Sequence, residues 1–375
     1  MTPSAVIPDP GPRSDPAPTA APTPNPALVP VPAPAAVVVA GRAWTIERVW
    51  PPRGLDPRRP LEASHRGTVR GGYIDAAGTV ELLAPDEDPG LPALGETVAH
   101  GRLISHRPGR RAVVRLDSGD GYAKVVPRKR AQRITEAHGR GRAFSAGLRV
   151  PTVVPTELDS ASVVCFSPLR GRSFSEMGAD PELSDSEWRA AWHSWSEGWL
   201  AAAACEPPSE LPVHDVAEET AVLREWALHG ADVLGASVVR TAERVAAGLE
   251  AASAPSALSH RDLHDGQLLW HPDEGVGLID LDTCARADPA LDLGNLAAHV
   301  EFAVRRGNWP RERAETALIT LAEVAAAIGI DATRLTAWRT ASLLRVACVN
   351  ALRPSRRSAA QLVWEHIEAE MSERT

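Results

Sequence analysis

The stretch that decides the fold runs from Ser259 to Leu296 and reads SHRDLHDGQLLWHPDEGVGLIDLDTCARADPALDLGNL. Within it, two short apolar runs, Gln267–Trp270 and Val276–Ile279, flank a turn at Pro272–Gly275, a pattern typical of a β-hairpin. Carboxylates stand at the ends of these runs: Asp262, Asp280 and Asp282. A hairpin that gathers aspartates at one edge is suited to hold a divalent cation and to orient a hydroxyl group.

The length and composition of the chain set broad limits. Its 375 residues are enough for one two-lobed domain or two packed units. With 44% apolar and 23% charged residues, it has the composition of an ordinary soluble globular protein. The formal net charge of -8 argues against nucleic acid as the main partner and is compatible with a cationic small substrate.

The sequence contains no evident membrane segment or secretion signal. The nearest candidate, Ala27–Ala40, is interrupted by three prolines and is too short to span a bilayer, and the only early cation is Arg13. The four cysteines are scattered without a CxxC pair, which favours free thiols over a zinc site. We therefore expect a cytoplasmic protein with no membrane partner.

Composition divides the chain into three parts. Residues 1–40 are rich in Pro and Ala and are expected to form a disordered tail, although a PxxP ligand is also compatible with them. Residues 41–166 are expected to form a β-rich N-terminal lobe, which includes an N-terminal extension over 41–100. Residues 167–375 are expected to form a larger helical C-terminal lobe, which gives a fold of the α+β class.

A lysine and a glutamate in the N-terminal lobe are candidates for an ion pair. Lys124 lies among apolar residues in the last strand of a three-strand meander predicted over 101–126. It needs an acidic partner or a ligand there, unless it is a charge that protects an edge strand. Glu136, in a helix predicted over 128–147, is the candidate partner.

The C-terminal half has strong helical patterns. Ser184 and Glu187 form a capping-box pattern at the start of a helix over 184–204. Four tryptophans recur on one face of that helix, which is more typical of core packing than of a cage for a cation: Trp188, Trp192, Trp195 and Trp199. Further helices are expected over roughly 217–250, 291–306, 311–327, 332–352 and 357–371.

The residues around the hairpin are suited to phosphoryl transfer. Asp262, at the head of a short loop, is able to orient a hydroxyl group or accept its proton, and Gln267 offers a neutral amide oxygen to a metal. Asp280, after the second strand, is able to coordinate Mg²⁺ on the phosphates of ATP. Such a reaction needs little more than positioning, a carboxylate near the nucleophile, a metal ion and a cation.

These residues carry a family resemblance. HRDLHDGQLLW, GLIDLD and DPALDLGN, in that order, are similar to the signature of the aminoglycoside phosphotransferase family, whose common form is H-G-D-x-x-x-x-N, I-D and D-P-x-x-D-L. The resemblance covers about residues 101–352 and is strongest over 258–299. It implies a protein-kinase-like bilobal fold that uses ATP and Mg²⁺.

The resemblance assigns roles to matching positions. Asp262 takes the place of the catalytic base, and Gln267 and Asp280 take those of the metal ligands. Lys124 takes the place of the lysine on the α- and β-phosphates, with Glu136 as its helix partner.

Four further positions are expected to serve the loop and the adenine. Asp292 matches a buried carboxylate that pins the catalytic loop, and His260 is expected to brace the backbone around Asp262. Cys165 and Ser167 fall within a hinge expected to hold adenine through backbone groups.

The sequence departs from the family pattern at two places. Gln267 replaces the usual Asn, although HRDxxxxQ followed by DPALDxGN resembles one branch of the family. A Gly-rich phosphate loop is missing, and the turn His106–Arg111 stands in its place. The three arginines of that turn, Arg107, Arg110 and Arg111, are expected to clasp phosphates, and a surface hairpin with solvated arginines is the alternative.

Other candidate groups have simpler interpretations. His260 and His264 are four residues apart and near His271, but without HExxH or cysteine support a zinc site is not favoured. Asp282 is either a second metal ligand or a turn cap. The acidic segment 206–219 and the acids of the last helix either line a site for a polycation or form a solvated face.

The sequence thus predicts an ATP- and Mg²⁺-dependent phosphotransferase that acts on a hydroxyl of a small molecule, such as an aminoglycoside-like compound, a sugar or an amino alcohol. The alternative is a non-catalytic nucleotide-binding protein on the same fold, motivated by Gln267 and the missing Gly-rich loop. A protein kinase is disfavoured because DPALDL follows Asp280 within about a dozen residues, which leaves no room for an activation loop.

Overall fold

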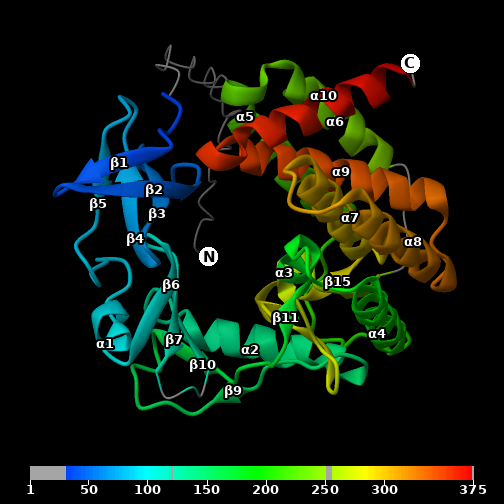
Figure 1. The fold of residues 1–375 in the computed structure, drawn as a ribbon, viewed down its shortest axis with the longest axis horizontal. Helices are drawn as coiled ribbons and strands as arrows, with labels where there is room; N and C mark the ends of the chain where they lie inside the picture. Colours follow the sequence, from blue (N-terminus) through cyan, green and yellow to red (C-terminus); the bar gives the residue numbers. More distant parts are fainter. Residues whose placement is uncertain (1–30, 118, 120, 251–255, 374–375) are drawn as a thin grey trace, which may run out of the picture.

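The computed structural model describes residues 31–373 except 118, 120 and 251–255, and Figure 1 shows its arrangement. Sheets dominate the chain up to Phe166, and helices dominate from Phe174 onward. The expected α+β, protein-kinase-like bilobal fold, with a small β-rich N-terminal lobe and a large helical C-terminal lobe, is confirmed. No helix among the described residues is both long and apolar enough to cross a membrane.

The N-terminal extension folds as an antiparallel five-stranded meander. Its strands follow one another in chain order: β1 (Ala36–Val39), β2 (Arg42–Val49), β3 (Arg59–His65), β4 (Thr68–Ile74) and β5 (Val80–Leu82). Alternate residues point to opposite faces of a strand, and one face buries Trp44, Ile46 and Leu61 in a core of its own. The extension is therefore a packed subdomain.

The predicted disordered tail is wrong in its last residues. Residues 36–39 pair with β2 from Ala36 opposite Thr45 to Val39 opposite Arg42. The β-branched run of valines favours a strand, and Ala40 and Gly41 close the hairpin with positive φ values of 50° and 73°. Residues 31–35 precede this strand and include the buried Ala33, and residues 1–30 of the predicted tail lie outside the described residues.

The second sheet forms the body of the N-terminal lobe. Its antiparallel strands lie in the order β6 (Gly101–Arg107), β7 (Arg111–Leu116), β8 (Tyr122–Val125), β10 (Val163–Phe166) and β9 (Val153–Val154). The predicted meander over 101–126 is confirmed. Three short helices accompany this sheet: α1 (Leu94–Val98), α2 (Ala131–Gly141) and the 3-10 helix η1 (Arg142–Ala146).

The extension contacts both lobes. Against the second sheet, the Gly71 N–H donates to His106 Nδ1 at 3.0 Å, and Glu62 Oε2 accepts from the His106 N–H at 2.6 Å. Against the helical lobe, Arg357 Nη2 donates to the Ala33 carbonyl at 3.3 Å. Figure 1 shows β1 and β2 beside the start of the red helix α10. The extension therefore connects the two lobes.

The C-terminal lobe is a helical array. Its helices are α3 (Phe174–Ala179), α4 (Asp185–Ala203), α5 (Val216–Leu234), α6 (Ser237–Glu250), α7 (Ala290–Arg305), α8 (Arg311–Ala327), α9 (Ala332–Ala351), the 3-10 helix η4 (Pro354–Arg356) and α10 (Arg357–Glu373). The capping box of Ser184 and Glu187 forms as predicted. The four tryptophans of α4 are buried in the core, as predicted. The helix predicted over 217–250 is two helices, because Gly235 ends α5 with a φ of 95°.

Short strands present the predicted hairpin at the junction of the lobes. β13 (Leu268–His271) and β14 (Gly275–Leu278) pair as predicted, and β11 (Arg172–Ser173) joins the β13 edge. The flanking strands β12 (Ala257–Ser259) and β15 (Ala285–Ala287) pair with each other. Two 3-10 helices lie beside them: η2 (Asp265–Gln267) and η3 (Leu281–Thr283).

Candidate active site

A buried carboxylate holds the loop that carries Asp262. Asp292, in the first turn of α7, accepts hydrogen bonds from the backbone N–H groups of His260 and Arg261, each at 2.7 Å. Arg261 has a φ of 69°, which an L-residue rarely adopts, so these two bonds hold a conformation that would otherwise cost about 1 kcal/mol or more. Burial raises the pKa of Asp292. Helix α7 thus holds the loop in place through Asp292.

The same loop is tied on two other sides. His260 Nε2 and the Ile279 carbonyl lie 3.0 Å apart, which joins the loop to the residue before Asp280. Asn295 Nδ2 donates to the Leu263 carbonyl at 2.8 Å. The carboxylate of Asp262 itself is exposed and has no hydrogen-bond or ion-pair partner in the part of the chain that the structure describes. The fold therefore fixes the backbone and leaves this carboxylate available.

Lys124 lies between two aspartates. Its Nζ donates to Asp280 Oδ1 at 2.8 Å and also contacts Asp282 Oδ2. Burial alone would lower the pKa of Lys124, but the two carboxylates raise it. Burial alone would raise the pKa of Asp280, but Lys124 and Arg111 lower it. Both groups are therefore charged across the neutral range, and a strand of one lobe is joined to the loop of the other lobe that carries Asp280.

The expected ion pair between Lys124 and Glu136 is not found among the described residues. Glu136 is exposed on α2, and its Oε1 accepts from Gln132 Nε2 at 2.8 Å. Because two residues turn a helix by about 200°, His138 faces inward where Glu136 faces out. The His138 ring is 4.9 Å from that of Phe166, and its Nε2 lies 2.8 Å from the Pro151 carbonyl. The assignment of Glu136 as partner of Lys124 is wrong.

The arginines of the β6–β7 turn point in different directions. The guanidinium of Arg107 lies 5.0 Å from the centre of the Trp50 ring, and burial lowers the pKa of Arg107 to about 9. Burial likewise lowers the pKa of Arg110 to about 10. Arg111, the third arginine of the predicted clasp, is the one that reaches the site: its Nη1 is 3.7 Å from Asp280 Oδ2. Arg107 packs against the extension, so its place in the phosphate clasp is not supported.

The hinge positions are engaged within the N-terminal lobe. Cys165 is a buried free thiol in β10, opposite Ala123 on one side and Val154 on the other. The Ser167 N–H donates to the Thr152 carbonyl at 2.8 Å. This N–H is therefore already paired, and the expected contact with adenine would have to replace that bond.

The oxygen atoms near Asp280 suit a magnesium ion. Gln267 is buried, its carbonyl accepts from the Ile279 N–H at 3.1 Å, and its side-chain Oε1 has no hydrogen-bond partner. Asp282 Oδ1 is also buried without a partner. Amide and carboxylate oxygens are hard donors, which Mg²⁺ prefers, and two of them here are buried without a partner. The residues present therefore fit this metal.

A histidine pair that the sequence did not reveal lies beside Asp262. The rings of His264 and His299 stack with centres 4.9 Å apart, next to the carboxylate of Asp265. Burial and the neighbouring His264 lower the pKa of His299. Nδ1 of His264 accepts from the Gly266 N–H at 3.0 Å, so that nitrogen is used inside the loop. Sequence spacing missed this pair because His299 comes from α7.

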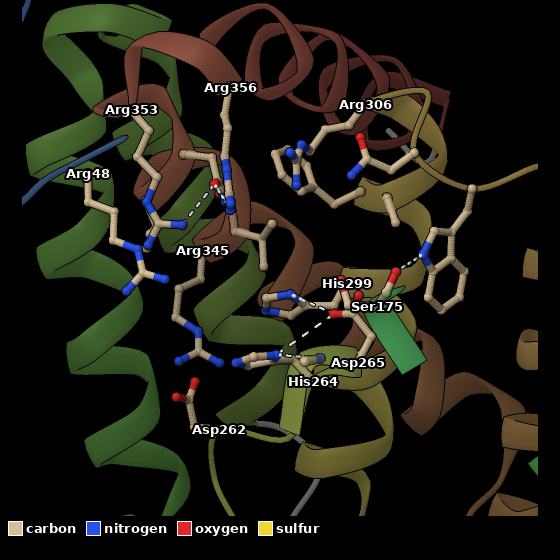
Figure 2. Close-up of a pocket in the computed structure, with 18 of the residues that line it drawn as sticks. Arg48, Ser175, Asp262, His264, Asp265, His299, Arg306, Arg345, Arg353 and Arg356 are labelled. Carbon is tan, nitrogen blue, oxygen red and sulfur yellow. Dashed lines mark hydrogen bonds and ion pairs between the residues drawn. The ribbon is translucent and has the colours of Figure 1, made fainter. Parts of the chain in front are cut away.

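A cavity of about 380 Å³ opens beside Asp262 (Figure 2). Arginines from both lobes line it: Arg48, Arg111, Arg306, Arg345, Arg353 and Arg356. Figure 2 shows Asp262 at one end of the cavity and Arg353 and Arg356 further along it. The feature of the sequence that could have indicated a basic cavity is the cluster LRPSRR at 352–357, where Pro354 lies between helices α9 and α10.

A family model described as the phosphotransferase enzyme family matches residues 102–328. The chain belongs to this family. The resemblance to aminoglycoside phosphotransferases is thereby confirmed, and the chain is a phosphotransferase with an alcohol group as acceptor. A search of curated proteins finds no match to the chain.

Solved structures of related enzymes are similar to the chain. Aminoglycoside phosphotransferase APH(3'')-Id from Streptomyces rimosus is 24% identical over 66% of this chain and 93% of its own, with a TM-score of 0.48. A choline/ethanolamine kinase family protein from Mesorhizobium loti is 20% identical over 72% and 88%, with a TM-score of 0.47. Macrolide 2'-phosphotransferase MphH from Brachybacterium faecium is 20% identical over 71% and 89%, with a TM-score of 0.40.

Proposed function

We propose that the protein transfers the γ-phosphoryl group of ATP to a hydroxyl group of a small molecule, with Asp262 as the catalytic base. The acceptor oxygen forms a bond to the γ-phosphorus while the bond from that phosphorus to the β–γ bridging oxygen breaks. The hydroxyl proton passes to Asp262, and ADP leaves. The observation that carries the proposal is the unpartnered carboxylate of Asp262, which lines a cavity while Asp292 fixes its backbone.

Gln267 and Asp280 would hold Mg²⁺. When bound, the ion supplies positive charge to the phosphate oxygens. The orphaned Oε1 of Gln267 supports this role, because a buried amide oxygen without a partner costs about 1–3 kcal/mol and coordination would recover that cost. Lys124 and Arg111, both beside Asp280, would bind the phosphates of ATP.

The test is ADP release from Mg²⁺-ATP across a panel of hydroxyl compounds. Asp262→Asn should lower kcat by about 100-fold or more, because the base is lost while the shape is kept. Asp273→Asn is the matched control, because that carboxylate is exposed in the hairpin turn. Gln267→Leu should raise the Mg²⁺ concentration needed for half-maximal rate by about 10-fold or more. Gln267→Asn, which keeps an amide oxygen, should bring that concentration most of the way back to the wild-type value.

Two outcomes would contradict the proposal. Equal ADP release by the wild type and Asp262→Asn would remove Asp262 from the chemistry. ATP binding that does not depend on Mg²⁺, with no turnover of any acceptor, would favour a non-catalytic nucleotide-binding protein.

A further inference from the structure

The cavity beside Asp262 is formed by segments that are distant in the sequence. Arg48 comes from β2 of the extension, Arg345 from α9, and Arg353 from the link between α9 and η4. Arg306 follows the end of α7, and Arg356 lies in η4. Figure 2 shows these side chains around the cavity that holds the Asp262 carboxylate. Its position next to Asp262 makes it the place where an acceptor would bind.

Positive charge dominates the walls of this cavity. Six arginines line it, against two carboxylates, Asp262 and Asp265. Half of the arginines have ion-pair partners: Arg48 with Glu62, Arg111 with Asp280, and Arg345 with Glu219. Arg306, Arg353 and Arg356 have no carboxylate partner among the residues that the structure describes.

The unpaired arginines crowd one another. Arg353 Nη1 and Arg356 Nη1 both donate to the amide oxygen of Asn350, each at 3.3 Å. Nε of Arg353 is buried and has no hydrogen-bond partner. Burial lowers the pKa of Arg353 to about 9, and the nearby charges of Arg356 and Arg48 add to the effect. Burial lowers the pKa of Arg356 to about 10. Both remain cations at neutral pH, in a site where only an anion relieves their mutual repulsion.

None of the acidic side chains of segment 206–219 or of α10 lines this cavity. Glu219 is buried against His214, whose Nε2 is 2.8 Å from its Oε2. Glu370, in α10, pairs with Arg339 at 3.3 Å and with His366 at 3.0 Å. Neither glutamate lines the cavity. Of the two alternatives left open by the sequence, the site for a polycation is therefore not supported at this cavity.

We infer that the acceptor is an anionic small molecule, an alcohol that also carries a phosphate or carboxylate group. Its anionic group is held by Arg353, Arg356 and Arg306, and its hydroxyl lies at Asp262. A guanidinium presents paired N–H donors that match the oxygens of either anion. This inference rests on the proposed function, because it takes the cavity beside Asp262 as the acceptor site.

The first experiment measures anion binding without catalysis. Inorganic phosphate and glycolate are titrated by calorimetry at constant ionic strength into the wild-type protein, the double variant Arg353→Gln/Arg356→Gln, and the control Arg311→Gln, an exposed arginine on α8. The wild type and the control should bind at least one of the two probes, and the double variant should bind about 10-fold or more weakly. Preference for phosphate or glycolate tells which anionic group the acceptor carries.

Two results would overturn the anion site. One is equal binding of the probes by the double variant and the wild type. The other is displacement of the probe by ADP, which would assign the arginines to the nucleotide. The Tm without ligand tests folding independently, because removal of crowded cations should leave the Tm of the double variant unchanged or raised. The variant Arg353→Lys keeps a positive charge and should keep part of the anion binding.

The second experiment measures ADP release with matched acceptors. Glycerol, glycerol 3-phosphate and glycerate form one set, glucose, glucose 6-phosphate and gluconate a second, and streptomycin is the polycation. Turnover should be confined to anionic members, and the double variant should raise their KM about 10-fold or more with little change in kcat.

The two hypotheses fail differently. Turnover of glycerol, glucose or streptomycin that Asp262→Asn abolishes and the double variant leaves unchanged would keep the proposed function and refute the anionic acceptor. Probe binding that needs the two arginines, with no ADP release from any compound, would keep the anion site and refute the proposed function.

Discussion

Arg345 donates a hydrogen bond from Nη2 to Oδ1 of Asn295 at 2.8 Å. The same asparagine donates from Nδ2 to the carbonyl of Leu263, the residue after Asp262. One amide therefore connects an arginine of the cavity wall with the loop that carries the proposed base. The cavity wall and the loop of Asp262 are joined at this point.

This connection predicts that Arg345 and Asn295 are coupled. Arg345→Gln and Asn295→Ala should each lower kcat/KM. The first removes the bond that holds the cavity wall to Asn295, and the second also removes the bond that holds the loop of Asp262. The double variant should lose less than the sum of the two, with a coupling energy of about 1 kcal/mol or more. A double-mutant cycle on kcat/KM measures it. Additive losses would show that the two residues act independently.

Asp292 is predicted to stabilise the fold as well as the loop. Asp292→Asn replaces a carboxylate that accepts two backbone N–H bonds with an amide that places an N–H donor against one of them. The free energy of unfolding should fall by about 2–3 kcal/mol, since one buried donor loses its acceptor. Urea denaturation measures the loss, with Glu323→Gln, an exposed carboxylate on α8, as control. A variant as stable as the control would contradict the proposed bracing.

Two glycines of α2 form a matched pair. A Cβ at Gly141 would lie 2.8 Å from Leu281 Cβ and 2.9 Å from Cys284 Sγ, whereas a Cβ at Gly139 meets nothing within 4 Å. Gly141→Ala should cost about 1–3 kcal/mol of stability by overpacking and should lower kcat, because η3 carries Asp282 next to Asp280. Gly139→Ala should stabilise by about 0.5–1 kcal/mol through helix propensity and leave kcat unchanged. Thermal unfolding and ADP release separate the two, and a similar response at both positions would argue against the contact with η3.

The pair of Lys124 and Asp280 predicts a pH dependence of stability. The pKa of Asp280 is lowered in the folded protein from an ordinary value of 3.8. The carboxylate then stabilises the fold fully above about pH 4, and the contribution is lost as the pH falls toward the folded pKa. Asp280→Asn should therefore be less stable than the wild type at pH 7, and the difference should shrink below about pH 4. Urea unfolding at pH 7, 5 and 3.5 measures how the difference in free energy of unfolding between the wild type and Asp280→Asn changes with pH. A difference that grows on acidification would contradict the prediction.

Much of the catalytic half was predictable because its signals are local. The hairpin of β13 and β14 follows from two short apolar runs on either side of a turn. The buried face of α4 follows from tryptophans that recur with the helical period of about 3.6 residues. Asp262, Gln267, Asp280 and Asp292 fall within one short stretch, so their proximity needed no long-range packing information.

Other contacts depend on packing between distant segments. Lys124 pairs with Asp280 and Asp282 across the lobe boundary, and sequence spacing pointed to Glu136 instead. The elements packed against α2 determine which of its faces is buried. The sequence of the helix alone did not show whether Glu136 or His138 would face inward. The arginines of the cavity come from β2, β7, α9 and the segments after α7 and α9, so their convergence is a property of the tertiary structure.

The contact between the extension and the helical lobe changes how the molecule is able to move. The lobes are joined by the chain that leaves β10, by the contact of Lys124 with Asp280, and at a further point where Arg357 Nη2 donates to the Ala33 carbonyl. A body attached at several points does not rotate about any one of them alone. A change in the spacing of the lobes therefore also has to shift or break the bond between Arg357 and Ala33, the residue three positions before β1. The segment that leads into the extension is thus part of the geometry that sets the distance between the lobes.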